Sequence, residues 1–206
     1  MAWTYEQKFN SLTDGDLNGQ DSWSGGTAVD VQTAVTYEGA KAIKEINGNT
    51  NMFRDVTAVT SGTLYIAGRM EAGFADGANF DMLSASGATL QTRLSLDGAG
   101  NITASHGGGA SIIVTGYSVD TWYLFEIVFT GSTFSIRYNT TGLPSGWSAS
   151  FGPYNYIAGA ADLDRIRLNL GGSQTSYWDT ITPTNPIVAA TTTTYPAGRL
   201  LMGVGM

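Results

Sequence analysis

The chain has 206 residues and a formal net charge of −7 at pH 7, and only 13% of its residues are charged. An acidic chain repels phosphate backbones, so we expect no nucleic-acid partner, and the lack of cysteine excludes disulfides and thiolate chemistry. Because exposed helical faces are normally rich in Lys and Glu, this low charge favours strands and turns over helices.

The predicted elements, in chain order, are strands separated by turns. Apolar and polar residues alternate with period 2, the pattern of half-buried strands, in segments 29–35, 64–70, 90–96, 134–138 and 163–170. Segment 121–130 is more continuously apolar, which is typical of a central strand, and KAIKEI (41–46) is interpreted as a strand with a charged outer face. Turn pairs such as Asp14-Gly15 and Asp97-Gly98 separate these runs. The pattern predicts an all-β sandwich or barrel.

The two ends differ from the rest of the chain. The first ten residues, MAWTYEQKFN, lack a basic segment followed by an apolar run, so we expect no secretory signal. No apolar stretch approaches 18 residues, so we expect no membrane insertion. Prolines and four consecutive threonines predict an extended C-terminal tail, 184–206, after a sandwich domain spanning 1–183. The tail is apolar, and we expect it to dock on another copy or another assembly subunit through Tyr195, Leu200, Leu201 and Met202.

The order of several motifs carries a family resemblance. They are FNSLTDGDLNGQDSW (9–23), YEGAKAIKEI (37–46), SGTLYIAGRM (61–70), YSVDTWYLFEIVF (117–129), TFSIRYN (133–139) and LDRIRLNLGG…YWDTITP (163–183). With these motifs, residues 3–183 resemble the concanavalin A-like and laminin-G-like jelly-roll domains. The resemblance implies a two-sheet antiparallel jelly-roll sandwich. That family contains sugar binders, polysaccharide lyases and hydrolases, adhesion modules and virion proteins, so the fold alone does not assign a function.

Catalytic residues are not evident in the sequence. A glycosidase needs two carboxyl groups, which enzymes of this fold place as alternating acids on one strand, and no such cluster occurs. Glu126 stands alone in an apolar strand, and Asp162 and Asp164 are followed at once by arginines. The single histidine, His106, lies in a glycine-rich segment interpreted as a solvated loop. We therefore expect a protein without enzymatic activity.

Calcium is the one cofactor that the resemblance implies. Related jelly rolls hold a structural ion where the first and last strands meet, and Asp179 occupies the matching position in YWDTI. Asn10 stands where a glutamate is common, which removes one negative charge from the site. The alternative for Asp179 is that it caps a turn or hydrogen-bonds the first strand.

Aromatic residues offer a ligand-binding hypothesis. Trp147, Tyr154 and Tyr156 lie in a segment rich in Gly and Pro, where an exposed ring could stack on a sugar. The alternative is that these rings cover the edge of a sheet. Other aromatic residues are expected to lie in the core, namely Trp23, Trp122, Phe125, Phe129 and Trp178.

The leading functional hypothesis is a non-enzymatic structural or binding module displayed on a particle surface, such as a phage decoration or fibre protein, with glycan binding as a further expectation. It rests on the missing signal, the missing cysteines, the Ser/Thr/Gly-rich surface and the tail. The alternatives are a free carbohydrate-binding protein and a polysaccharide-cleaving enzyme.

Overall fold

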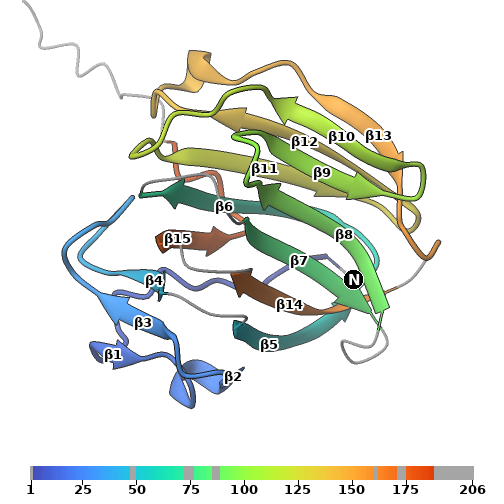
Figure 1. The fold of residues 1–206 in the computed structure, drawn as a ribbon. Helices are drawn as coiled ribbons and strands as arrows, with labels where there is room; N and C mark the ends of the chain where they lie inside the picture. Colours follow the sequence, from blue (N-terminus) through green and yellow to red (C-terminus); the bar gives the residue numbers. More distant parts are fainter. Residues whose placement is uncertain are drawn as a thin grey trace, which may run out of the picture.

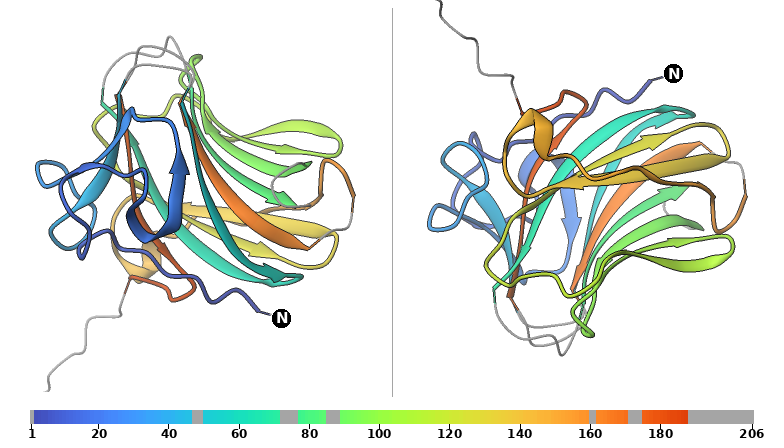
Figure 2. Two further views of the ribbon diagram at one scale, coloured as in Figure 1. Left: turned by 90° about the horizontal axis from the view of Figure 1, so that it is seen from below. Right: turned by 90° about the horizontal axis from the view of Figure 1, so that it is seen from above.

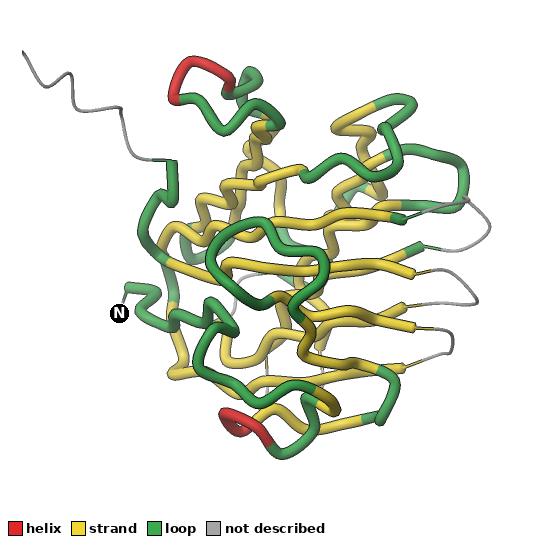
Figure 3. The backbone as a smooth tube through the Cα atoms, turned by 90° about the vertical axis from the view of Figure 1, so that its left-hand side faces the viewer, coloured by secondary structure: helices red, strands yellow, loops and turns green. Residues whose placement is uncertain are grey.

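Two antiparallel β-sheets pack face to face in this protein (Figures 1 and 2). The computed structural model describes residues 2–46, 50–71, 77–84, 89–159, 162–170 and 175–187. The predicted all-β sandwich is confirmed. Within the described residues, two short 3-10 turns, η1 (Gln20–Ser22) and η2 (Pro144–Gly146), lie outside the sheets (red in Figure 3). No helix of this part of the chain is long and apolar enough to cross a membrane.

Each sheet combines strands that are distant in sequence. In order across the first sheet, its eight strands are β1 (Gly15–Asp16), β3 (Val29–Gln32), β4 (Ala42–Ile46), β15 (Thr175–Thr182), β6 (Gly62–Met70), β11 (Tyr123–Phe129), β12 (Thr133–Asn139) and β13 (Phe151–Asn155). The seven strands of the second are β10 (Gly109–Val114), β9 (Ile102–His106), β8 (Thr89–Leu96), β7 (Ala78–Ser84), β14 (Leu163–Leu170), β5 (Thr50–Val59) and β2 (Trp23–Gly25). The last strand, β15, lies between β4 and β6, so the end of the domain is locked between early strands.

Most predicted strands form within a residue or two of their expected bounds, and β14 matches its prediction at both ends. The exception is the first, because β3 ends at Gln32 rather than at Val35. The side chain of Gln32 accepts hydrogen bonds from the backbone N–H groups of Ala34 and Val35, at 2.7 and 2.9 Å. These local bonds turn the chain away from the sheet.

The hydrophobic core lies between the sheets, and alternate residues of both contribute to it. Burying each large apolar side chain there contributes about 1.5–3 kcal/mol. The core includes Trp23, Met52, Leu64, Ile66, Phe80, Leu94, Phe125, Phe129, Ile166, Leu168 and Trp178.

The prediction that Trp122 belongs to this core is wrong. Tyr123 faces the interior, so the neighbouring Trp122 points to the outer side of the eight-stranded sheet. There its ring packs edge-on against Tyr37 and Tyr177, with centroids 5.8 and 6.5 Å apart. A continuous apolar run does not reveal which of its residues face inward.

A glycine makes room for the largest core side chain. Gly68 on β6 lies opposite Trp178 on β15, and a Cβ atom at Gly68 would approach the indole Cζ3 to 2.7 Å. Any larger residue would displace the Trp178 ring, which is fully buried.

One of the buried carboxyl groups lies in segment 41–46, for which the sequence predicted a charged outer face. Glu45 on β4 is fully buried, and its Oε2 accepts hydrogen bonds from Ser176 Oγ (2.6 Å) and Trp178 Nε1 (2.8 Å). Its Oε1 is buried with no partner among the described residues. Burial raises the pKa of Glu45 to about 7, an effect that the two hydrogen bonds reduce and the negative charge of Asp81 reinforces.

Glu45 should make stability depend on pH. Between pH 4.5 and about 7 the native state keeps a proton that the unfolded chain releases, so the free energy of unfolding should fall as pH rises through this range. Glu45→Gln should raise the free energy of unfolding at pH 8 by about 1–3 kcal/mol and make its dependence on pH less steep. Urea unfolding at pH 5 and pH 8 measures both, with the exposed Glu6→Gln as control. A Glu45→Gln profile as steep as that of the parent protein would contradict this assignment.

The end of the described chain crosses the outer side of the eight-stranded sheet. Ile187 is 8% exposed and packs in a small apolar cluster with Tyr65, Ala67 and Leu124. The tail residues expected to mediate assembly, namely Tyr195, Leu200, Leu201 and Met202, lie outside the described residues. Their docking role stays a prediction.

Candidate functional site

The outer face of the seven-stranded sheet carries polar side chains in aligned rows. On β7 and β14 alternate residues are apolar and enter the core, as do Met52 on β5 and Leu94 and Leu96 on β8. The residues between them therefore face outward. The register places them opposite one another across four adjacent strands, β8-β7-β14-β5. We refer to these outward side chains as the polar face; they are Asn51, Phe53, Asp55, Asn79, Asp81, Arg93, Ser95, Arg165, Arg167 and Asn169.

The first row of the polar face is a ladder of amide hydrogen bonds. Ser95 Oγ donates to Asn79 Oδ1. Asn79 Nδ2 donates to Asn169 Oδ1 at 3.0 Å, and Asn169 Nδ2 donates to Asn51 Oδ1 at 3.0 Å. Asn79 and Asn169 each accept one bond and donate another, so the ladder fixes the orientation of both amides, and Asn51 ends it as an acceptor.

The second row centres on a buried carboxylate. Asp81 has no exposed side-chain surface, and it lies between Arg93 and Arg167. Arg93 donates to both carboxylate oxygens, at 2.7 and 3.0 Å, and Arg167 donates to Oδ2 from Nε (2.7 Å) and from Nη2. The hydrogen bonds to Asp81 raise the pKa of Arg93, so its guanidinium stays charged. Beyond Arg167 the row ends at Phe53, whose ring centroid lies 5.9 Å from the guanidinium carbon.

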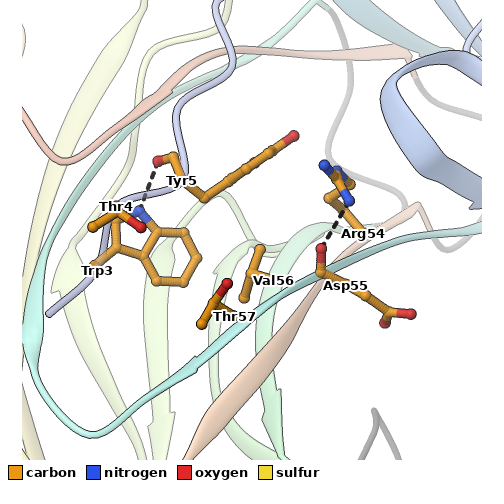
Figure 4. A pocket seen from close by; sticks show the side chains of 7 residues that line it. All are labelled: Trp3, Thr4, Tyr5, Arg54, Asp55, Val56 and Thr57. Carbon is orange, nitrogen blue, oxygen red and sulfur yellow. Dashed lines mark hydrogen bonds between the residues drawn. The ribbon is translucent and has the colours of Figure 1, made fainter. Parts of the chain in front are cut away.

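A pocket of about 290 Å³ adjoins the polar face at β5 (Figure 4). Asp55 pairs with Arg165 on the polar face and also lines the pocket. The Arg54 guanidinium lies 4.9 Å from the Tyr5 ring centroid and donates to the Asp55 carbonyl at 2.9 Å. Arg54 and Val56 alternate with Asp55 on β5 and therefore face the opposite side of the strand. Figure 4 shows the Asp55 carboxylate pointing away from the other lining side chains, so the pocket lies beside the N-terminal segment and is separate from the polar face. Its lining residues are Trp3, Thr4, Tyr5, Arg54, Asp55, Val56 and Thr57.

The three aromatic residues predicted to bind ligand do not share one surface. Trp147 lies on the outer side of the eight-stranded sheet, under the Arg137 guanidinium (4.7 Å) and beside Tyr65. Tyr154 lies at the β13 edge. Tyr156 is 2% exposed and donates to the Thr130 carbonyl at 2.9 Å, which contradicts its expected exposure. The ring of Tyr156 instead stacks on Phe134 in the core, with centroids 6.0 Å apart.

His106 is also less solvated than its sequence context predicts. It ends β9, and its ring stacks on Tyr154 with centroids 4.4 Å apart and planes at 5°. Its Nδ1 accepts from the Gly108 N–H at 3.0 Å, and its Nε2 lies 2.9 Å from Ser111 Oγ. Because β9 and β13 belong to different sheets, this stack closes one edge of the sandwich.

Glu126, which the sequence leaves isolated, is fully engaged on the eight-stranded sheet. It accepts two hydrogen bonds from Arg137, at 2.7 and 2.8 Å, and one from Tyr65 Oη at 2.6 Å. Asp162 and Asp164, at the start of β14, are exposed and half-buried respectively. None of these acids belongs to the polar face as defined above.

Asp179 and Asn10 anchor the same loop. Asp179 is buried, and its carboxylate accepts from the N–H groups of Tyr37 (2.8 Å), Glu38 (3.1 Å) and Thr180 (2.7 Å). Asn10 Oδ1 accepts from the backbone N–H groups of residues 40 and 41, at 2.6 and 2.9 Å. Gly39, at φ +67°, lies against the Asn10 side chain with no room for a Cβ atom.

This geometry does not fit a calcium site. The oxygens that would bind the ion already accept backbone N–H groups, and no cluster of three or more His, Cys, Asp or Glu occurs among the described residues. Of the two alternatives for Asp179, its bonds to the N–H groups of residues 37 and 38 fit the capping of a turn and not a bond to the first strand. Calcium binding by Asp179 and Asn10 stays an untested prediction.

The polar face was missed because its signal is spread over the sequence. It lies in NFD (79–81), RLS (93–95) and RLN (167–169), where a polar or charged residue stands on both sides of an apolar one. Each triplet by itself predicts only a half-buried strand. An Arg on two strands and an Asp on a third indicate one cluster only once the register is known.

Comparisons with known proteins bear on the fold. No protein-family model and no curated protein matches the sequence. Among solved structures, the chain is similar to a sialidase (TM-score 0.62, 13% identity), of which it spans only 18% while 87% of this chain is covered. A GH131 beta-glucanase catalytic domain from Podospora anserina has a TM-score of 0.60 at 14% identity, with 90% of this chain and 97% of that one covered. A Bacillus licheniformis beta-glucanase has a TM-score of 0.55 at 9% identity, with 88% and 98% covered.

The chain has the concanavalin A-like jelly-roll fold. The expectation that it lacks enzymatic activity is corrected by these comparisons, because structures that share the fold over nearly their whole length include glucanases. Acids need not alternate on one strand to share a face, because strand pairing brings together residues distant in sequence, as it does for Asp55 and Asp81.

Asp179→Ala should test the loop anchor against the metal site. Loss of the carboxylate leaves three backbone N–H groups without their acceptor, and we expect the free energy of unfolding to fall by about 3 kcal/mol. Thermal melting with and without excess chelator gives the comparison, with the exposed Asp162→Ala as control. An anchoring role predicts the same loss in both conditions. A parent protein that melts earlier with chelator, and a variant that does not respond to it, would instead establish bound calcium.

Proposed function

We propose that this protein binds a glycan on the polar face of the seven-stranded sheet. The observation that carries the proposal is the pair of aligned rows, one of amides and one of guanidinium groups around Asp81, that cross four adjacent strands. A sugar presents hydroxyl groups at regular intervals, and each hydroxyl both donates and accepts. An extended surface of fixed donors and acceptors complements such a ligand.

The polar face is ordered before any ligand arrives. Each amide of the first row is hydrogen-bonded to its neighbour, and both arginines of the second row are bonded to Asp81. Binding would therefore cost little additional side-chain entropy. Phe53, half-buried at the end of the second row, supplies an apolar surface for a sugar ring.

The structural comparisons support this class of ligand. Two of the three similar structures are named as beta-glucanases and the third as a sialidase, so the fold is one used by proteins that act on carbohydrates. They favour a free carbohydrate-active protein over a particle component, since none of the three is a virion protein. Display on a virion or particle surface stays a prediction.

Phe53→Ala should weaken glycan binding. Loss of ring contact with the sugar should cost about 1 kcal/mol, which is roughly a fivefold rise in Kd. Calorimetric titration against a panel of neutral, uronate and sulfated oligosaccharides measures it, with Val128→Ala as control. Val128 is an exposed apolar residue, 39% exposed, on the outer side of the other sheet. If Val128→Ala weakens binding and Phe53→Ala does not, the ligand binds the eight-stranded sheet.

Polysaccharide cleavage is a second candidate, because two carboxyl groups, Asp55 and Asp81, belong to the polar face. Glycosidases use a pair of carboxyl groups on either side of the bond that breaks. If the protein is a hydrolase of this face, it should release reducing ends from a β-glucan, and Asp55→Asn should lower the rate at least a hundredfold by removing the exposed carboxyl group. Asp81→Asn should lower the rate by releasing the two arginines that cover the buried Asp81.

The control for this assay is Asp30→Asn, a half-buried carboxyl group on β3 of the other sheet. Circular dichroism must show that each variant is folded. Equal rates in Asp81→Asn and Asp30→Asn would exclude the polar face as the catalytic centre.

A further inference from the structure

The centre of the polar face carries an excess of positive charge. Arg93 and Arg167 share the single carboxylate of Asp81, so two guanidinium groups face one negative charge. The chain as a whole has a net charge of −7, so this excess is a local feature. An anionic ligand would gain nothing from the overall charge, and its attraction would have to come from this cluster.

The buried carboxylate also directs the two guanidinium groups. Asp81 has no exposed side-chain surface, whereas the side chains of Arg93 and Arg167 are 29% and 21% exposed. In each arginine, the edge of the guanidinium group that carries Nε and Nη2 donates to the Asp81 carboxylate. A ligand above the sheet therefore meets arginine and not aspartate. Guanidinium groups bind planar or tetrahedral oxyanions through paired hydrogen bonds.

The eight-stranded sheet provides a contrast. There Arg137 binds Glu126 with similar geometry, at 2.7 and 2.8 Å, but one arginine faces one carboxylate and the pair is neutral. Tyr65 adds a further donor to the same carboxylate. Excess positive charge is thus a property of the Asp81 cluster and not of every arginine–carboxylate pair in this fold.

We infer that the polar face takes an anionic glycan and binds its acidic group, a uronate carboxylate or a sulfate ester, at Arg93 and Arg167. This inference rests on the proposed glycan-binding function and specifies its ligand class. The amide row beside the cluster, which includes Asn79 and Asn169, would meet the hydroxyl groups of the same chain. Phe53 next to Arg167 would contact the apolar side of a sugar ring.

The test compares three oligosaccharides of equal length with the full chain by calorimetric titration. The probes are oligogalacturonate, a sulfated carrageenan oligosaccharide and a neutral laminarin oligosaccharide. At least one anionic probe should bind tenfold or more tightly than the neutral one, and its affinity should fall between 50 and 200 mM NaCl. The two anionic probes distinguish carboxylate from sulfate recognition.

Substitution then locates the site. Arg93→Gln and Arg167→Gln should each lower affinity for the anionic probe at least tenfold and change affinity for the neutral probe less than threefold. Arg137→Gln is the matched control, because it breaks an arginine–carboxylate pair on the other sheet. If a Gln variant melts more than 10 °C lower, Arg93→Lys replaces it, since Lys keeps the charge but lacks the paired donors. Lys should then retain the salt dependence and lose most of the affinity.

The outcomes separate the two proposals. Equal affinity for neutral and anionic probes, with loss of both in Phe53→Ala, overturns the anionic specificity and leaves the glycan-binding face intact. Anionic binding that Arg137→Gln abolishes and Arg93→Gln does not overturns both assignments of the site. The absence of binding to any of the three probes overturns the inference together with the proposed function.

Discussion

The carboxylate of Asp81 organises the surface on which the proposed function depends. A buried charge is costly unless paired and hydrogen-bonded, and here two arginines from the strands on either side supply the pairing. The same bonds link β7 to β8 and β14 and hold both guanidinium groups against Asp81. Loss of Asp81 would free two like charges side by side, so stability and ligand recognition depend on one group.

The two outer faces of the sandwich differ in chemical character. On the eight-stranded sheet, Tyr65, Leu124 and Ile187 form an apolar cluster, and the end of the described chain lies across it. On the seven-stranded sheet, the polar face consists of amides, guanidinium groups, carboxylates and one serine hydroxyl, with one phenylalanine. A chain of sugars needs an open, polar and ordered surface, and the polar face is the one that provides it.

The edges of the sandwich are held by contacts between segments far apart in sequence. The stack of His106 on Tyr154 joins β9 of one sheet to β13 of the other. Asp179, near the end of the domain, binds the N–H groups of residues 37 and 38, and Asn10 binds those of residues 40 and 41. Such contacts join segments that the strand pairing of the two sheets does not connect.

Periodicity by itself determined the strands and the fold class, because alternation reflects a local property, the two sides of an extended chain. The apolar run of segment 121–130 also placed Phe125 and Phe129 in the core, and the family resemblance placed Trp23 and Trp178 there. Periodicity did not determine the direction of Trp122, the burial of Tyr156 or the partners of His106, because each depends on a neighbour distant in sequence. The polar face also depends on neighbours distant in sequence. Arg93 and Arg167 lie 12 and 86 residues from Asp81 along the chain, and the three form one cluster only when β7, β8 and β14 pair. Register between strands is fixed by the packing of the whole core, and no segment carries that information alone.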